Sequence, residues 1–170
     1  MKSFGKLVIM LMIGLTAAIV VYPFLHESGH SVAALIVGGR IIEYHLLPIP
    51  YVLCDVGKVT LAGQAFIGIG GTILPIVMAT VFHPNKWFWA WYGNLMMRGI
   101  CVLSAAITAA ASFLYAAGNP VANEDITSVL NITPDLIKEV IIASLLILVF
   151  LIIIIARDKP IKRIGDYLLK

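Results

Sequence analysis

The stretch that decides the fold is Leu7–His30, LVIMLMIGLTAAIVVYPFLHESGH. Its first part, Leu7–Leu25, contains no charged residue, and about 20 apolar residues are enough to cross a bilayer as a helix. Three more charge-free stretches follow, Val59–Asn85, Gly99–Asn123 and Val140–Ala156. With 61% hydrophobic and 12% charged residues, the composition is that of a membrane protein. We therefore expect an all-α polytopic membrane protein with about four transmembrane helices, at about residues 7–37, 61–82, 94–117 and 134–156.

These spans use most of the 170 residues, so we expect a single membrane-embedded domain over residues 1–170. Basic residues gather at both ends of the chain: Lys2 and Lys6, then Arg157, Lys159, Lys162, Arg163 and Lys170. Lys and Arg flank the cytoplasmic ends of spans, which predicts a multi-pass protein of the cell membrane with both termini cytoplasmic. The net charge of +3 is thus explained without a nucleic-acid partner. The first apolar run also resembles a signal peptide, but it continues directly into His26, which favours an uncleaved span.

The segment Arg40–Thr60, after the first span, differs from the rest of the chain. It contains strand-prone apolar residues, two prolines (Pro48 and Pro50) and the turn-like run Asp55–Lys58. We expect a short β-hairpin or a re-entrant segment here. Because an apolar strand edge is not stable in lipid, this segment should pack against protein.

The second and third spans each carry an unusual feature. The second is rich in glycine, which fits close helix packing as well as a thin segment beside a buried site. Before the third span, Trp87, Trp89 and Trp91 are typical of a membrane interface. Arg98, near the start of the third span, is expected to reach that interface with its side chain.

The run His26-Glu27-Ser28-Gly29-His30 at the end of the first span fits the pattern H-E-x-x-H. On a helix, His26 and His30 lie one turn apart on the same face, so both imidazoles can bind one Zn²⁺ ion. Glu27 can then activate a zinc-bound water as general base. Ionisable residues in an apolar span are costly, which favours a functional site over buried structural residues.

A catalytic zinc ion also needs a third protein ligand. If the N-terminus is cytoplasmic, the loop between the third and fourth spans opens on the same side of the membrane as His26 and His30. This loop contains Glu124 and Asp125, with Asp135 at its edge. We expect Asp125 to be the ligand, with Asp135 as the second candidate.

The run FLHESGHSVAALIVGGRI, residues 24–41, resembles the zinc-binding helix of the site-2 protease family of intramembrane metalloproteases. The glycine-rich run IGIGGTILP and the loop NEDITSVLNITP also resemble minimal, single-domain members. The resemblance implies one Zn²⁺ per chain, bound by His26, His30 and Asp125, with Glu27 as the catalytic acid and base. It also implies that the strand-like segment holds an extended substrate by edge pairing.

The expected function is therefore zinc-dependent hydrolysis of peptide bonds in membrane-embedded or membrane-proximal protein substrates. Asn94, Asn119 and Asn123 are candidate donors to the oxyanion, although each also fits a loop or a helix cap. The alternative is a non-proteolytic metal-binding membrane protein with a sensing or assembly role. That alternative is favoured by the absence of the Asp-Gly sequence found around the third ligand in better-known members of the family.

Overall fold

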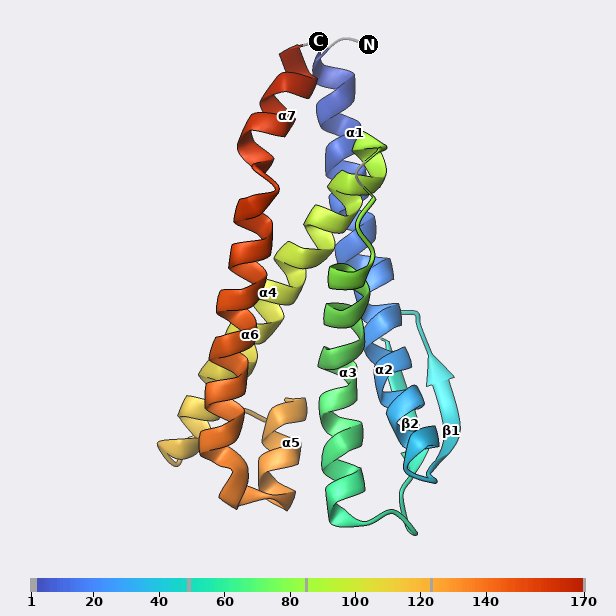
Figure 1. Ribbon diagram of the computed structural model, residues 1–170. Helices are drawn as coiled ribbons and strands as arrows, with labels where there is room; N and C mark the ends of the chain where they lie inside the picture. The colour runs from blue at the N-terminus through green and yellow to red at the C-terminus, as the bar shows by residue number, and fades with distance from the viewer. Residues whose placement is uncertain (1–2, 49, 85, 123, 170) are drawn as a thin grey trace.

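The protein was analysed as a computed structural model that describes residues 3–48, 50–84, 86–122 and 124–169 (Figure 1). It is mostly helical, with one small β-hairpin. The helices are α1 (Ser3–Thr16), the π-helix η1 (Ala17–Val21), α2 (Tyr22–Ile36), α3 (Leu61–Val81), α4 (Phe88–Ala116), α5 (Asp125–Ile132), the 3₁₀ turn η2 (Pro134–Leu136), α6 (Ile137–Arg157) and α7 (Pro160–Leu169). The strands are β1 (Arg40–His45) and β2 (Tyr51–Asp55).

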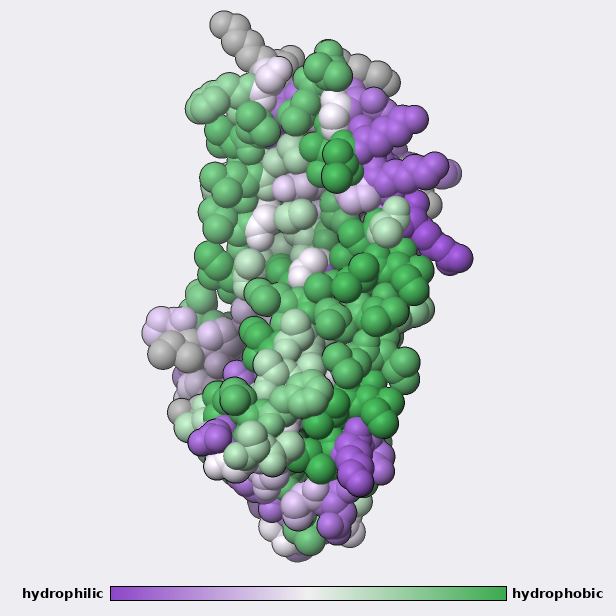
Figure 2. All heavy atoms as spheres, turned by 90° about the vertical axis from the view of Figure 1, so that its left-hand side faces the viewer, coloured by the Kyte–Doolittle hydropathy of each residue, from purple (hydrophilic) through white to green (hydrophobic). Residues whose placement is uncertain are grey.

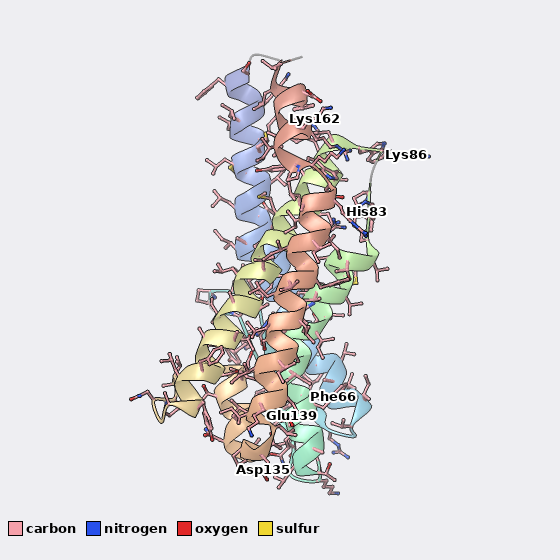
Figure 3. The ribbon with its side chains drawn as sticks, turned by 60° about the vertical axis from the view of Figure 1, so that its left-hand side comes forward. Phe66, His83, Lys86, Asp135, Glu139 and Lys162 are labelled. Carbon is pink, nitrogen blue, oxygen red and sulfur yellow. The ribbon has the colours of Figure 1, made fainter. Side chains whose placement is uncertain are left out.

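Four helical segments are long and apolar enough to cross a membrane: Ser3–Ile36, Leu61–Val81, Phe88–Ala116 and Pro134–Leu169. Figure 1 shows both termini at the same end of the molecule, as an even number of crossings requires. Figure 2 shows a largely hydrophobic face, with hydrophilic residues gathered toward the two ends. The side chains labelled in Figure 3 follow the same division, with His83, Lys86 and Lys162 near one end and Asp135 and Glu139 near the other.

The first helical segment changes its geometry next to Pro23. Proline has no N–H to donate and its ring crowds the carbonyl four residues earlier, which here is that of Ile19. Ile19 lies within η1, so the loosening expected at Pro23 takes the form of a π-helical turn. The segment ends at Gly38, whose φ of 83° allows the N–H of Gly39 to bond to the carbonyl of Ala34 at 2.8 Å.

The expected strand segment forms an antiparallel hairpin in which Arg40 faces Asp55 and His45 faces Tyr51. Figure 1 shows the hairpin beside α2. Tyr44 of β1 fastens it there, because its hydroxyl donates to the carbonyl of Phe24 at 3.2 Å and lies 3.0 Å from the Ser28 hydroxyl. The hairpin is thus anchored to the helix that carries the H-E-x-x-H motif.

Glycine allows α2 and α3 to approach each other closely. A Cβ atom at Gly29 would overlap the carbonyl oxygen of Gly70, and one at Gly70 would lie 2.7 Å from the carbonyl oxygen of Gly29. On the other side of α3, a Cβ at Gly68 would overlap the side chain of Val129 in α5. Both interpretations of the glycine-rich span therefore apply: the helices pack closely, and α3 is thin beside the motif.

The expectation that Arg98 reaches the interface is wrong. Helix α4 begins at Phe88, earlier than expected, so Arg98 lies three turns inside it and is 1% exposed. Its guanidinium donates to the carbonyl of Ala79 at 2.9 Å, to Asp158 at 2.6 Å and to Nδ1 of His83 at 2.6 Å. Arg98 therefore joins the ends of α3 and α6 to α4. Because its charge is paired with Asp158 inside the bundle, its side chain does not have to extend to water.

Replacing Gly29 with alanine should destabilise the protein, because the new methyl group meets the rigid backbone of α3. We expect a loss of about 1–3 kcal/mol, the usual cost of overpacking, seen as a lower melting temperature in detergent. Gly99→Ala is the matched control, since a Cβ atom there meets nothing within 4 Å and alanine favours a helix. Equal melting temperatures for both variants would contradict the close approach of α2 and α3.

Candidate metal centre

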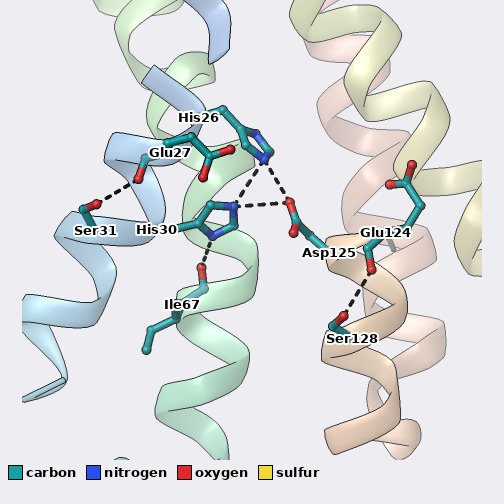
Figure 4. A network of polar contacts seen from close by, with 8 residues as sticks. All are labelled: His26, Glu27, His30, Ser31, Ile67, Glu124, Asp125 and Ser128. Carbon is teal, nitrogen blue, oxygen red and sulfur yellow. Dashed lines mark hydrogen bonds and ion pairs between the residues drawn. The ribbon is translucent and has the colours of Figure 1, made fainter. Parts of the chain in front are cut away.

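Three side chains from two helices, α2 and α5, meet inside the bundle (Figure 4). His26 and His30 come from successive turns of α2, and Asp125 is the first residue of α5. Nε2 of His26 lies 3.2 Å from Nε2 of His30, and Oδ2 of Asp125 lies 2.9 Å and 3.3 Å from these two nitrogens. Among the described residues this is the one group of three such side chains that could hold a metal ion.

His30 is oriented by the backbone of α3. Its Nδ1 donates to the carbonyl oxygen of Ile67 at 2.7 Å, because a carbonyl can only accept. A neutral His30 therefore presents the lone pair of Nε2 to the centre, which is the form that binds a metal. Gly71 makes room for this ring, since a Cβ atom there would overlap it.

His26 is held by ring contacts. Its imidazole lies against Tyr22, with ring centroids 5.8 Å apart, and meets the edge of His30 at 4.8 Å. Its Nδ1 is buried and has no hydrogen-bond partner among the residues that the structure describes. Packing within α2 therefore aims Nε2 of His26 at the centre without a hydrogen bond from Nδ1 to a neighbouring carbonyl or carboxylate.

Asp125 reaches the centre because α5 packs into the bundle. Ile126, Val129 and Leu130 are buried in one apolar cluster with Ala65 of α3 and Ala111 of α4. Burial of the Asp125 carboxyl opposes its ionisation, but contacts with His26 and His30 outweigh burial and hold its pKa below the usual range. The carboxylate is therefore the form present at neutral pH.

The other residues considered from the sequence lie elsewhere. Asp135, in the exposed turn η2, is not part of the group, and Figure 4 shows the Glu124 side chain pointing away from Asp125. Asn94 donates to the carbonyl of Phe82 at 2.5 Å, and Asn119 donates to that of Ala117 in an exposed loop at 3.2 Å. Asn123 lies outside the described residues.

A cavity of about 710 Å³ opens beside the cluster. Tyr22, His26, Glu27 and Asp125 line it, together with residues of α3, α4 and α6, most of them apolar. Tyr22 was missed from the sequence, although its position one turn before His26 was a readable signal, since residues four apart share a helix face. The lining also includes Glu124 and Glu139, so the cavity combines a possible metal centre, three glutamates and a phenol.

The three ligand atoms could hold a metal ion, and their spacing is compatible with that of a zinc site. In tetrahedral zinc sites the ligand atoms lie about 3.4 Å from one another, because zinc–nitrogen and zinc–oxygen bonds are about 2.1 Å long. The observed separations, 2.9–3.3 Å, are slightly shorter than that value. When His30 is neutral, its Nε2 lone pair and the Asp125 carboxylate face the same point, where one cation can bind both.

No family model, no curated protein and no solved structure matches this chain.

Asp125→Ala should reduce bound metal strongly, because it removes one of the three ligand atoms. We expect about one zinc ion per chain in the purified parent and much less in the variant, by elemental analysis. Asp135→Ala is the matched control and should keep its metal. Metal loss in Asp135→Ala but not in Asp125→Ala would move the ligand role to Asp135.

Proposed function

We propose that this protein is a zinc-dependent intramembrane endopeptidase that resembles the site-2 protease family. The observation that carries the proposal is the cavity in which Glu27 accompanies His26 and Asp125. A pure metal-binding site does not need a carboxylate beside the ligands, whereas hydrolysis requires a base there. Figure 4 shows the Glu27 carboxylate on the side of the two imidazoles.

We also propose that the protein is an integral multi-pass membrane protein with both termini on the cytoplasmic side of the cell membrane. The four apolar helices and the basic residues at the end that holds both termini support this orientation. His30 contacts α3 at Ile67 and Gly71, about 9 Å and about 15 Å along the helix from its first residue. In a hydrocarbon layer about 30 Å thick, the proposed centre then lies inside the bilayer and not at its surface.

The chain holds zinc through His26, His30 and Asp125, and zinc when bound supplies Lewis-acid polarisation of water and of the scissile carbonyl. Glu27 accepts a proton from the attacking water while the water oxygen bonds to the carbonyl carbon. Glu27 then passes this proton to the amide nitrogen as the carbon–nitrogen bond breaks. The products are a carboxylic acid and an amine, and a further proton exchange between them gives the carboxylate and the ammonium form.

Tyr22 is suited to stabilise the negative charge that develops on the carbonyl oxygen. It lines the cavity, its ring lies against that of His26, and its hydroxyl lies beside that of Ser104. A phenol that donates to the oxyanion contributes most when water is excluded. This role replaces the one considered for Asn94 and Asn119, whose amides bond to backbone carbonyls.

The proposed substrate is a transmembrane or membrane-proximal protein segment. Most of the cavity lining is apolar, but Thr72, Ser104 and Thr108 also face it. Ser112 and Ser144 donate to carbonyls one turn back in their own helices, whereas Thr72 and Thr108 make no such bond among the described residues. The hydroxyls of Thr72 and Thr108 are therefore available to the backbone of a peptide that has lost its helical hydrogen bonds.

Glu27→Gln should abolish cleavage and keep the metal, because an amide of the same shape accepts no proton at neutral pH. The measurement is cleavage of single-span protein substrates in liposomes by zinc-loaded protein, with elemental analysis in parallel. A variant that cleaves as fast as the parent would overturn the mechanism. A parent that binds zinc but cleaves no substrate in a broad panel would favour the alternative role in sensing or assembly.

Tyr22→Phe should lower kcat by about 10²-fold with little change in KM, because one donor to the oxyanion is lost. Binding of a phosphinate peptide, which mimics the tetrahedral intermediate, should weaken by a similar factor in calorimetry. Tyr92→Phe is the matched control, since Tyr92 packs in an apolar cluster away from this cavity. An unchanged kcat in Tyr22→Phe would remove this role while leaving that of Glu27 intact.

A further inference from the structure

A second cavity, separate from the metal centre, lies in the half of the molecule that holds the termini. It has a volume of about 500 Å³ and runs between α1, α3 and α4. It shares no lining residue with the cavity beside His26. Its lining is almost wholly apolar, and includes Met12, Ala17, Leu25, Met78, Phe82 and Ala90.

A third cavity adjoins this apolar one at the connection between α3 and α4. The third cavity has a volume of about 580 Å³, and Phe82 and Ala90 line both. Its other lining residues include His83, Lys86 and Trp87. The two neighbouring cavities are called the groove below, with an apolar part between helices and a polar end at a loop.

The polar end of the groove has one available cation. His83 is engaged, since its Nδ1 accepts from Arg98 at 2.6 Å and its Nε2 lies 3.7 Å from Asp158. Lys86 is exposed and makes no ion pair among the described residues, and no acidic residue lines this part. Trp87, 77% exposed, is the kind of residue that anchors at the level of lipid headgroups.

The surroundings of this end are also basic. Arg157, Lys159 and Lys162 are exposed on the end of α6 and the start of α7, and Figure 3 shows Lys162, Lys86 and His83 near the same end of the molecule. An anionic group at the mouth of the groove thus meets positive charge from more than one segment. Basic pockets between helices on the cytoplasmic side bind anionic lipid headgroups in this way.

We propose that this groove is a binding site for an anionic glycerophospholipid, with an acyl chain between α1, α3 and α4 and the phosphate beside Lys86. An extended peptide does not fit the apolar part, because its N–H and C=O groups would lie without partners. The one amide there, that of Asn94, already donates to the carbonyl of Phe82. An acyl chain needs no such partners, and its phosphate complements the charge at the mouth.

The test uses the full-length protein in detergent, titrated separately with phosphatidylglycerol and phosphatidylcholine and followed by native mass spectrometry. We expect the parent to bind phosphatidylglycerol more tightly. Lys86→Gln should weaken this lipid about fivefold, the effect of one basic residue near a headgroup, and leave phosphatidylcholine unchanged. Lys58→Gln is the matched control, because Lys58 lies in the turn after β2, outside the groove.

Ala90→Phe tests the apolar part, since its ring would fill the groove where the two cavities meet. It should reduce binding of both lipids, while the melting temperature and zinc content show that the fold is intact. If this variant fails to fold, Gly93→Leu, also in the groove lining, provides the same test. Any of three results would overturn the proposal. The parent could bind both lipids equally, Lys86→Gln and Lys58→Gln could have equal effects, or oleate could bind more tightly than phosphatidylglycerol.

Discussion

The close approach of α2 and α3 is the constraint on which the rest of the structure depends. Because Gly29 and Gly70 have no side chains, the two backbones come near enough for Nδ1 of His30 to reach the carbonyl of Ile67. That bond sets the direction of Nε2, and the absence of a side chain at Gly71 leaves room for the ring. The glycine before the second histidine is therefore part of the metal centre, although it offers no ligand atom.

The positions of the motif's side chains could be predicted from the sequence because they are local. The spacing of His26 and His30 follows from helical geometry, with Glu27 placed between them by the chain itself. The sequence could not separate Asp125 from Asp135 by type or by loop, because both are acidic and both belong to the same loop. Packing is what brings Asp125 to the two histidines: α5 enters the bundle on its apolar face, where Gly68 makes room for Val129, and Asp125 is its first residue.

Contacts between residues far apart in the sequence could not be predicted. Arg98 looked like an interfacial residue because its partner, Asp158, lies 60 positions away, in a part of the chain that reads as a basic tail. The tryptophans looked typical of a membrane interface, yet Trp91 is 2% exposed inside α4 and packs against Arg163, which lies 4.2 Å from its ring centroid. In both cases the tail folds back on the bundle, and no local pattern reports this.

The bundle contains two ionisable clusters, one around Arg98 and one formed by His26, His30 and Asp125, and they differ in how their polar groups are paired. The guanidinium of Arg98 donates to Ala79, Asp158 and His83, so this cluster is internally paired and joins three helices. At the other cluster, His26, His30 and Asp125 lie close to one another, and the group opens onto a cavity with Glu27 and Tyr22. Ionisable groups in mostly apolar surroundings cost free energy unless they are paired with one another or bind an ion. Such an open cluster of ionisable groups is what a site for a metal ion would require.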